Sequence, residues 1–216
     1  MTPLLFDLDG TLVDSRIVIV RQWGALCERL GLDFAEVLKV LHGRRSADTI
    51  RAVAPHVDAD TEAARLDADE AVDVDGLVPV AGAPELLARL PAGSWGIVTS
   101  GPRELAERRL RAVGLPVPPA MVCGDEIERG KPDPEGFLAG ARLLGVAPEG
   151  CVAFEDAPAG VGAAIAAGMA VVGITTTHPA SDLGAAGVVI DDLTGFEAAL
   201  AVLGRGVPGE PDARRR

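Results

Sequence analysis

The stretch LLFDLDGTLVDS, from Leu4 to Ser15, begins as an apolar run and places two aspartates, Asp7 and Asp9, directly behind it. Residues i and i+2 of a strand point to the same side, so both carboxylates are expected to lie together at the strand's end. Like charges held that close repel each other unless a cation lies between them. The stretch therefore predicts a buried strand that ends in a cation-binding site.

The rest of the chain alternates strand-like runs with helical patterns. The expected strands, short and continuously apolar, are Leu4–Leu8, Trp95–Thr99, Met121–Cys123, Cys151–Phe154, Ala170–Ile174 and Gly187–Ile190. Helical patterns cover Ala83–Leu90, Arg103–Val113, Pro134–Leu144, Ala157–Ala167 and Leu193–Leu203. Continuous apolar runs are typical of strands covered on both faces. Their alternation with helices predicts an α/β fold with a doubly wound parallel sheet.

One segment breaks this alternation, because residues 15–79 contain helical patterns and no convincing strand. Its expected helices are Ser15–Leu30, Phe34–Leu41, Ser46–Val53 and Ala59–Val74. We interpret this segment as a small helical cap inserted into a core made of residues 1–14 and 80–203. Residues 204–216 are rich in Gly, Pro and Arg and are expected to form a disordered tail.

Composition narrows the function further. The chain has 216 residues and a net charge of −12, which argues against nucleic acid as a partner because phosphate backbones require a basic face. It shows neither a signal-peptide pattern nor an apolar run near the roughly 20 residues of a membrane span, so we expect a cytoplasmic protein, monomeric or weakly dimeric, without membrane contact. The three cysteines and three histidines lack ligand spacing, so any metal must be bound by oxygen.

Ligands of open α/β sheets gather at the carboxyl ends of the strands. Polar residues lie at or just after the ends of the first, second and fourth of the expected strands: Asp7, Asp9, Thr99, Ser100, Glu155 and Asp156. Lys131 precedes the expected helix that starts at Pro134 and is expected at the same edge. Carboxylates, a hydroxyl, a lysine and free backbone N–H groups together fit Mg²⁺ and a phosphate. The expected partner is therefore a small phosphorylated metabolite.

These side chains are expected to have different roles in the reaction. Asp7 is the better placed nucleophile, and Asp9, two residues on, is expected to act as general acid and then base. Mg²⁺ would be held by Asp7, the backbone carbonyl of Asp9, and Asp156. Glu155 is expected to assist the metal from behind these ligands or through a metal-bound water.

The phosphate needs its own contacts. Thr99 and the N–H groups near Ser100 are expected to donate to phosphoryl oxygens, and Lys131 to offset the charge on Asp7 and on the phosphoryl group. Such positioning and charge stabilisation supplies most of the catalysis in phosphoryl transfer.

Four motifs in order carry a resemblance to a known family: DLDGT at Asp7–Thr11, the strand-end Thr99, Lys131 in RGKPDPEGF, and FEDAPAG at Phe154–Gly160. The sequence resembles the haloacid dehalogenase-like (HAD) phosphohydrolases with a helical cap after the first strand. The resemblance covers all but the tail. It implies a Rossmann-like core, an aspartyl-phosphate on Asp7, acid–base work by Asp9, a metal ligand in Asp156, and phosphate contacts from Thr99 and Lys131.

The cap is expected to choose the substrate. The stretch LHGRRSADTI, Leu41–Ile50, resembles the cap segment of sugar- and polyol-phosphate phosphatases, including the glycerol-phosphate type. Gly43 would permit a close backbone approach, and Arg44 or Arg45 would bind hydroxyls or the phosphate. A surface loop with solvated arginines explains the same residues.

Other functions remain open. A β-phosphoglucomutase shares the motifs, although Ser46 stands where the resemblance leads us to expect that group's cap arginine, and a phosphoglycolate-type phosphatase also fits. A dehalogenase has no need of Asp9, and a phosphonate hydrolase needs a cap lysine, where the chain has only Lys39 in an ordinary helix. A non-catalytic phosphate-binding module would be expected to lose Asp7, Asp9 or Lys131. A dinucleotide site at Gly160–Gly162 conflicts with the acidic residues beside it.

Overall fold

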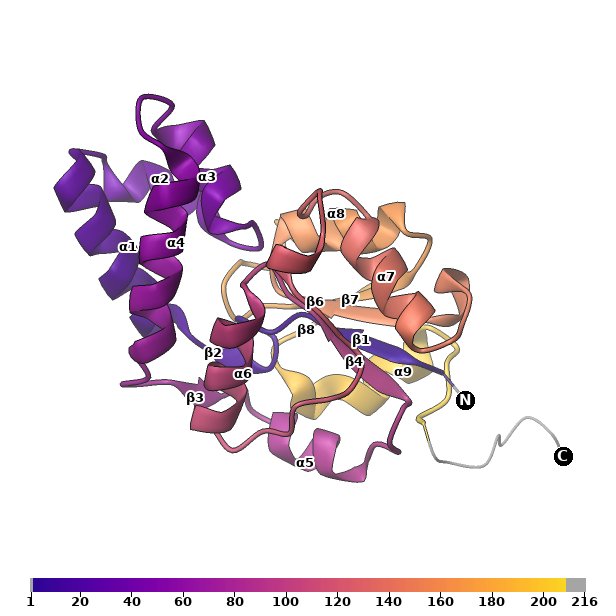
Figure 1. The fold of residues 1–216 in the computed structure, drawn as a ribbon. Helices are drawn as coiled ribbons and strands as arrows, with labels where there is room; N and C mark the ends of the chain where they lie inside the picture. The colour runs from indigo at the N-terminus through magenta and orange to yellow at the C-terminus, as the bar shows by residue number, and fades with distance from the viewer. Residues whose placement is uncertain (1, 209–216) are drawn as a thin grey trace, which may run out of the picture.

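The protein, seen in a computed structural model that describes residues 2–208, is an α/β core with a helical bundle beside it (Figure 1). The main sheet of the described residues has six parallel strands in the order β5-β4-β1-β6-β7-β8. Its strands are β1 (Leu4–Phe6), β4 (Trp95–Val98), β5 (Met121–Val122), β6 (Val152–Glu155), β7 (Ala170–Ile174) and β8 (Val188–Ile190). The predicted α/β fold with a parallel sheet is confirmed.

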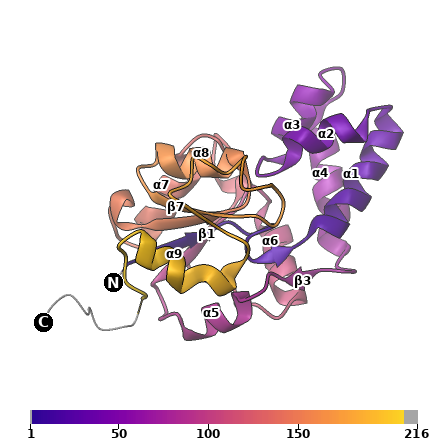
Figure 2. The ribbon, with the colours of Figure 1, turned by 180° about the vertical axis from the view of Figure 1, so that it is seen from behind.

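Helices cover both faces of this sheet, as Figures 1 and 2 show from opposite sides. One face packs on α5 (Ala83–Arg89), α6 (Arg103–Ala112), α9 (Phe196–Val202) and the short η3 (Leu193–Gly195), and the other on α7 (Glu135–Leu143) and α8 (Pro158–Ala166). Two more single-turn helices are η1 (Gly124–Glu126) and η2 (Pro148–Gly150). Consecutive residues of β1 point to opposite faces of the sheet: Phe6 packs in the apolar core with α5, α6 and α9, and Leu5 in the core with α7 and α8. Burial on both faces explains why the strands are apolar without alternation.

The helical bundle consists of α1 (Arg16–Leu30), α2 (Phe34–Leu41), α3 (Ser46–Val53) and α4 (Ala59–Val72). It has an apolar core of its own, to which Trp23, Ile50 and Leu66 contribute. Asp58 caps α4 by accepting from the backbone N–H groups of its first turn, which satisfies donors that a helix start leaves free. Against the sheet domain the bundle packs α4 on α6.

A second, two-stranded sheet lies where the sequence analysis expected no strand. Val13–Asp14 (β2) pairs antiparallel with Val78–Pro79 (β3), so the two chain crossings between core and bundle run side by side. The first strand also ends at Phe6 rather than Leu8, because the Leu8 carbonyl accepts from the N–H groups of Leu12 and Val13 and closes a turn. Both features depend on contacts that periodicity does not report.

The predicted tail, residues 204–216, lies partly outside the described residues, which end at Pro208. Within the described part, Arg205 donates to the Glu149 carbonyl at 2.8 Å, and Pro208 is buried. No helix among residues 2–208 has the length and apolar character that crossing a membrane would require.

The stacked aromatics at the centre of the sheet provide a test of the core. Phe6 is fully buried, with its ring 4.8 Å from that of Phe154, so Phe6→Ala is expected to lower the free energy of unfolding by about 3–5 kcal/mol. Val202→Ala, at a side chain that is 72% exposed, is the control and should change it by less than about 0.5 kcal/mol. Urea unfolding measures both. Equal effects of the two substitutions would contradict this account of the core.

Candidate active site

Asp7 follows β1 directly and lies buried at the carboxyl edge of the sheet, with its backbone N–H donating to the Phe154 carbonyl at 2.9 Å. Lys131, from the loop before α7, donates from Nζ to Asp7 Oδ1 at 2.5 Å, to Glu155 Oε1 at 2.6 Å and to the Val98 carbonyl at 3.0 Å. The ammonium group therefore has three acceptors, contributed by β4, β6 and the end of β1. This network holds the loop of Lys131 against the sheet edge.

Burial governs the charges of this group. Burial raises the pKa of Asp7, and the Lys131 ammonium opposes that rise. Burial alone would lower the pKa of Lys131, but the carboxylates of Asp7 and Glu155 raise it above its ordinary value. Lys131 is therefore positively charged at neutral pH, and it limits the rise of the Asp7 pKa, which burial still brings to about 8.

Asp156 completes an acidic cluster with Asp7 and Glu155, whose ligand atoms all lie within 4.8 Å of one another. Thr177 donates its hydroxyl to Asp156 Oδ2 and so orients this carboxylate. Burial and the neighbouring carboxylates raise the pKa of Asp156. Glu155 Oε2 is buried without a hydrogen-bond partner among the described residues. Three buried carboxylates face one ammonium, so the donor set fits a divalent cation bound by oxygen.

Two glycines make room for these carboxylates. Gly10 has a φ of +84°, and a side chain there would collide with the Asp156 carboxylate. Gly160, in the first turn of α8, has the Glu155 carboxylate where its own side chain would begin. The glycines of the DLDGT and FEDAPAG motifs are thus explained by the space that the acidic cluster needs.

Thr99 and Ser100 follow β4 at the same edge of the sheet. Thr99 is buried, and its oxygen accepts from the Gly101 N–H at 3.2 Å, which leaves the hydroxyl hydrogen available to a ligand. The Ser100 hydroxyl donates to the Gly43 carbonyl at 2.9 Å, so this side chain holds a loop of the bundle on the core.

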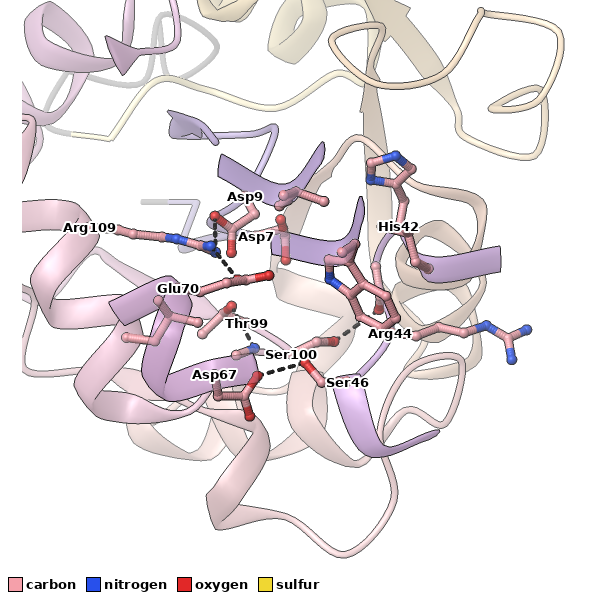
Figure 3. A pocket seen from close by; sticks show the side chains of 16 residues that line it. Asp7, Asp9, His42, Arg44, Ser46, Asp67, Glu70, Thr99, Ser100 and Arg109 are labelled. Carbon is pink, nitrogen blue, oxygen red and sulfur yellow. Dashed lines mark hydrogen bonds and ion pairs between the residues drawn. The ribbon is translucent and has the colours of Figure 1, made fainter. Parts of the chain in front are cut away.

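The structure places the three predicted bundle residues differently from one another. Gly43 has a φ of +75° and brings its backbone against Ala157, as a close approach requires. The Arg45 guanidinium donates hydrogen bonds to the Asp48 carboxylate at 2.7 Å and to the Ile127 carbonyl at 3.2 Å. Arg44 lines the pocket at the site, but its side chain is exposed and extends away from the aspartates (Figure 3).

The pocket lies between the sheet edge and the bundle and contains residues that the sequence analysis missed (Figure 3). Its bundle side is lined by Trp23, His42, Ser46, Asp67 and Glu70. Ser46 donates to Asp67 at 2.6 Å. Burial, with His178 nearby, lowers the pKa of His42 to about 4, so its imidazole is neutral at pH 7. This wall presents acceptors and neutral groups to the pocket.

Arg109, on α6, joins the core to this wall. It is buried and forms ion pairs with Asp9 Oδ1 at 2.7 Å and with Glu70 Oε2 at 2.5 Å (Figure 3). Burial raises the pKa of Glu70 to about 7, and Arg109 opposes that rise. A sequence signal for Glu70 existed, because it continues the apolar stripe of Ala63 and Leu66 at helical spacing. A charge on a buried stripe indicates a buried partner.

Comparisons with known proteins agree with this geometry. A family model described as haloacid dehalogenase-like hydrolase matches residues 4–168. Hexitol phosphatase A of Escherichia coli is 40% identical over 194 residues, covering 88% of this chain and 90% of that protein. Validoxylamine A 7'-phosphate phosphatase of Streptomyces hygroscopicus is 41% identical over 199 residues, covering 88% and 93%. The crystal structure of a hydrolase from Pseudomonas syringae superposes with a TM-score of 0.81 at 27% identity, covering 93% and 98%. The chain belongs to the haloacid dehalogenase-like hydrolase family.

Proposed function

We propose that this protein is a magnesium-dependent phosphatase that hydrolyses a small sugar or polyol phosphate through an aspartyl-phosphate on Asp7. The observation that carries the proposal is the buried Asp7 carboxylate, paired with Lys131 and opening into the pocket. The phosphatase names of the two relatives support the same reaction. A cytoplasmic location, where phosphorylated metabolites are made and consumed, is part of the proposal.

The residues take the following roles. An Asp7 oxygen attacks phosphorus while Lys131 offsets the charge that accumulates on the phosphoryl group. Thr99 and the backbone at Ser100 donate to phosphoryl oxygens. Asp9 protonates the departing alkoxide and then takes a proton from the water that hydrolyses the aspartyl-phosphate. Proton transfer of this kind requires Asp9 to reach the leaving group from the pocket wall, which it lines.

Asp7, the backbone carbonyl of Asp9, and Asp156 would hold the Mg²⁺, with Glu155 acting through Lys131 or a water. Magnesium prefers hard oxygen ligands and, when bound, would draw off negative charge from the phosphoryl group. The preference for magnesium over other divalent cations is a proposal that rests on this oxygen-only donor set.

The bundle, residues 15–79, is proposed to act as the cap that admits the substrate. Two arginines of the described chain line the pocket: Arg109 is occupied by two carboxylates, and Arg44 extends outward. The charge of Glu70 is offset by Arg109, whereas Asp67 forms no ion pair among the described residues, and its carboxylate would accept hydrogen bonds from hydroxyl groups and disfavour a second anion. This wall supports a neutral, hydroxylated leaving group and weighs against the bisphosphate of a mutase and the carboxylate of phosphoglycolate.

Replacement of the nucleophile is the first test. Asp7→Asn keeps the shape of the side chain but replaces the nucleophilic carboxylate with a neutral amide, so phosphate release should fall below roughly one-thousandth of the wild-type rate. Asp182→Asn, at an exposed aspartate, is the control and should keep full activity. Circular dichroism checks that both variants fold. Full hydrolysis by folded Asp7→Asn would exclude the proposed mechanism.

Metal removal is the second test. A chelator should stop phosphate release and added Mg²⁺ should restore it, because three buried carboxylates would otherwise repel the substrate. Asp156→Asn removes one proposed ligand and should raise the Mg²⁺ concentration for half-maximal rate by roughly 10–100-fold. Undiminished release in chelator, with Mg²⁺ absent from the purified protein, would refute the metal assignment.

The substrate itself is the third test. Because the Asp67 carboxylate lines the pocket and would repel the carboxylate of 2-phosphoglycolate, kcat/KM for a hexitol or glycerol phosphate should exceed that for 2-phosphoglycolate by roughly 10-fold or more. Asp67→Asn keeps an acceptor for Ser46 but removes the charge, so it should lower the ratio of kcat/KM for the polyol phosphate to kcat/KM for 2-phosphoglycolate. Preference for phosphoglycolate, or conversion of a hexose 1-phosphate into its 6-phosphate, would favour the alternatives.

A further inference from the structure

The Arg109 guanidinium links two carboxylates that belong to different parts of the chain. Asp9 lies in the loop after β1, whereas Glu70 lies on α4 of the bundle. The side chains of Arg109 and Glu70 are only 3% and 5% exposed. Both terminal nitrogens of Arg109 face a carboxylate, whereas its Nε has no partner among the described residues. Arg109 therefore donates a hydrogen bond to Glu70 and pairs with Asp9 by charge, at 2.7 Å.

We propose that Arg109, held by Glu70, is a positioning residue that fixes the Asp9 carboxyl so that Oδ2 delivers the proton to the leaving group. The inference rests on the proposed phosphatase function. A guanidinium has N–H donors and no acceptor, so the Asp9 oxygen that faces it, Oδ1, cannot carry the acidic proton. The proton is thereby confined to Oδ2.

Exposure supports this division between the two oxygens. Oδ1 of Asp9 is buried 2.7 Å from Arg109 Nη1 and accepts no hydrogen bond among the described residues, so the ion pair is its one polar contact there, while the Asp9 side chain as a whole is 22% exposed and lines the pocket. In the first step the bond between Asp7 and phosphorus forms as the bond from phosphorus to the ester oxygen breaks. The ester oxygen takes the proton from Asp9 Oδ2 and leaves as an alcohol. Asp9 becomes a carboxylate, whose new charge the guanidinium of Arg109 balances.

A purely structural role for the same contacts is the competing explanation. Arg109 and Glu70 would then only join α6 to α4, and their loss would weaken every activity of the protein alike. The two explanations differ in their dependence on the leaving group. An alkoxide needs a proton in order to depart, whereas 4-nitrophenolate is stable without one. Loss of a correctly placed acid therefore affects an alkyl phosphate far more than 4-nitrophenyl phosphate.

The experiment compares the rates of the first half-reaction for glycerol phosphate and 4-nitrophenyl phosphate by rapid quench with the full-length protein and Mg²⁺. In Arg109→Met, the ratio of the glycerol to the nitrophenol release rate should fall by roughly 10²-fold from its wild-type value. Asp9→Asn should lower the same ratio and serves as the benchmark. Arg108→Met is the matched control on the same helix, since Arg108 is exposed and pairs with Glu104, and should leave the ratio unchanged.

A second variant keeps the test decisive if Arg109→Met, which leaves Glu70 buried without its partner, fails to fold. The double variant R109M/E70Q removes that stranded charge. If Arg109 only neutralised Glu70, the double variant would regain the wild-type ratio, which would overturn the inference. A ratio that stays low in the double variant supports it.

Equal losses on both substrates in Arg109→Met, or no loss on either, would overturn the positioning role while leaving the proposed function intact. A wild-type protein that releases neither alcohol nor nitrophenol would instead overturn the proposed function, and the inference with it.

Discussion

The buried Lys131 ammonium is the interaction on which the rest of the structure depends. It joins Asp7 and Glu155, and the contact to Asp7 spans 124 residues of sequence. A buried ion left without its partners costs several kcal/mol, so the loop of Lys131, the end of β1 and the end of β6 must all be in place together. The parallel sheet supplies this arrangement, because its strands all end at the same edge. Asp156 and the two crowded glycines then have a defined space to occupy.

Contacts between the core and the bundle determine the shape of the pocket. Ser100 holds the Gly43 loop, Arg45 reaches the Ile127 carbonyl, and Arg109 reaches Glu70. Each contact joins the bundle to the core, in addition to the paired crossings of β2 and β3. The groups that face a leaving group are therefore set by how the bundle rests on the core. We propose that Asp67 in this wall favours a hydroxylated leaving group over one that carries a second anionic group.

The predictability of the fold differs from that of the site. Each strand of the parallel sheet was predicted to within about two residues, because strands buried on both faces leave a continuous apolar run. Asp7, Lys131 and Asp156 were predicted to meet because each follows a strand or precedes a helix at one edge. The short β2–β3 pairing was missed, since two-residue strands carry no periodicity. Arg109 and Glu70 were missed because each appeared as one charge in an amphipathic helix, and nothing local pairs one helix with another. Either Arg44 or Arg45 was expected to contact the substrate, and the structure pairs Arg45 with Asp48, three residues on, which the sequence analysis did not anticipate.

The most direct test of the central claim is to trap the covalent intermediate. The enzyme is quenched in acid during turnover of a polyol phosphate with Mg²⁺, treated with borohydride, which reduces acyl phosphates to alcohols, and digested for mass spectrometry. The account predicts homoserine at position 7 in the wild-type protein, absent when substrate is omitted. Rapid turnover with no homoserine at position 7, or with homoserine at Asp9 instead, would contradict it.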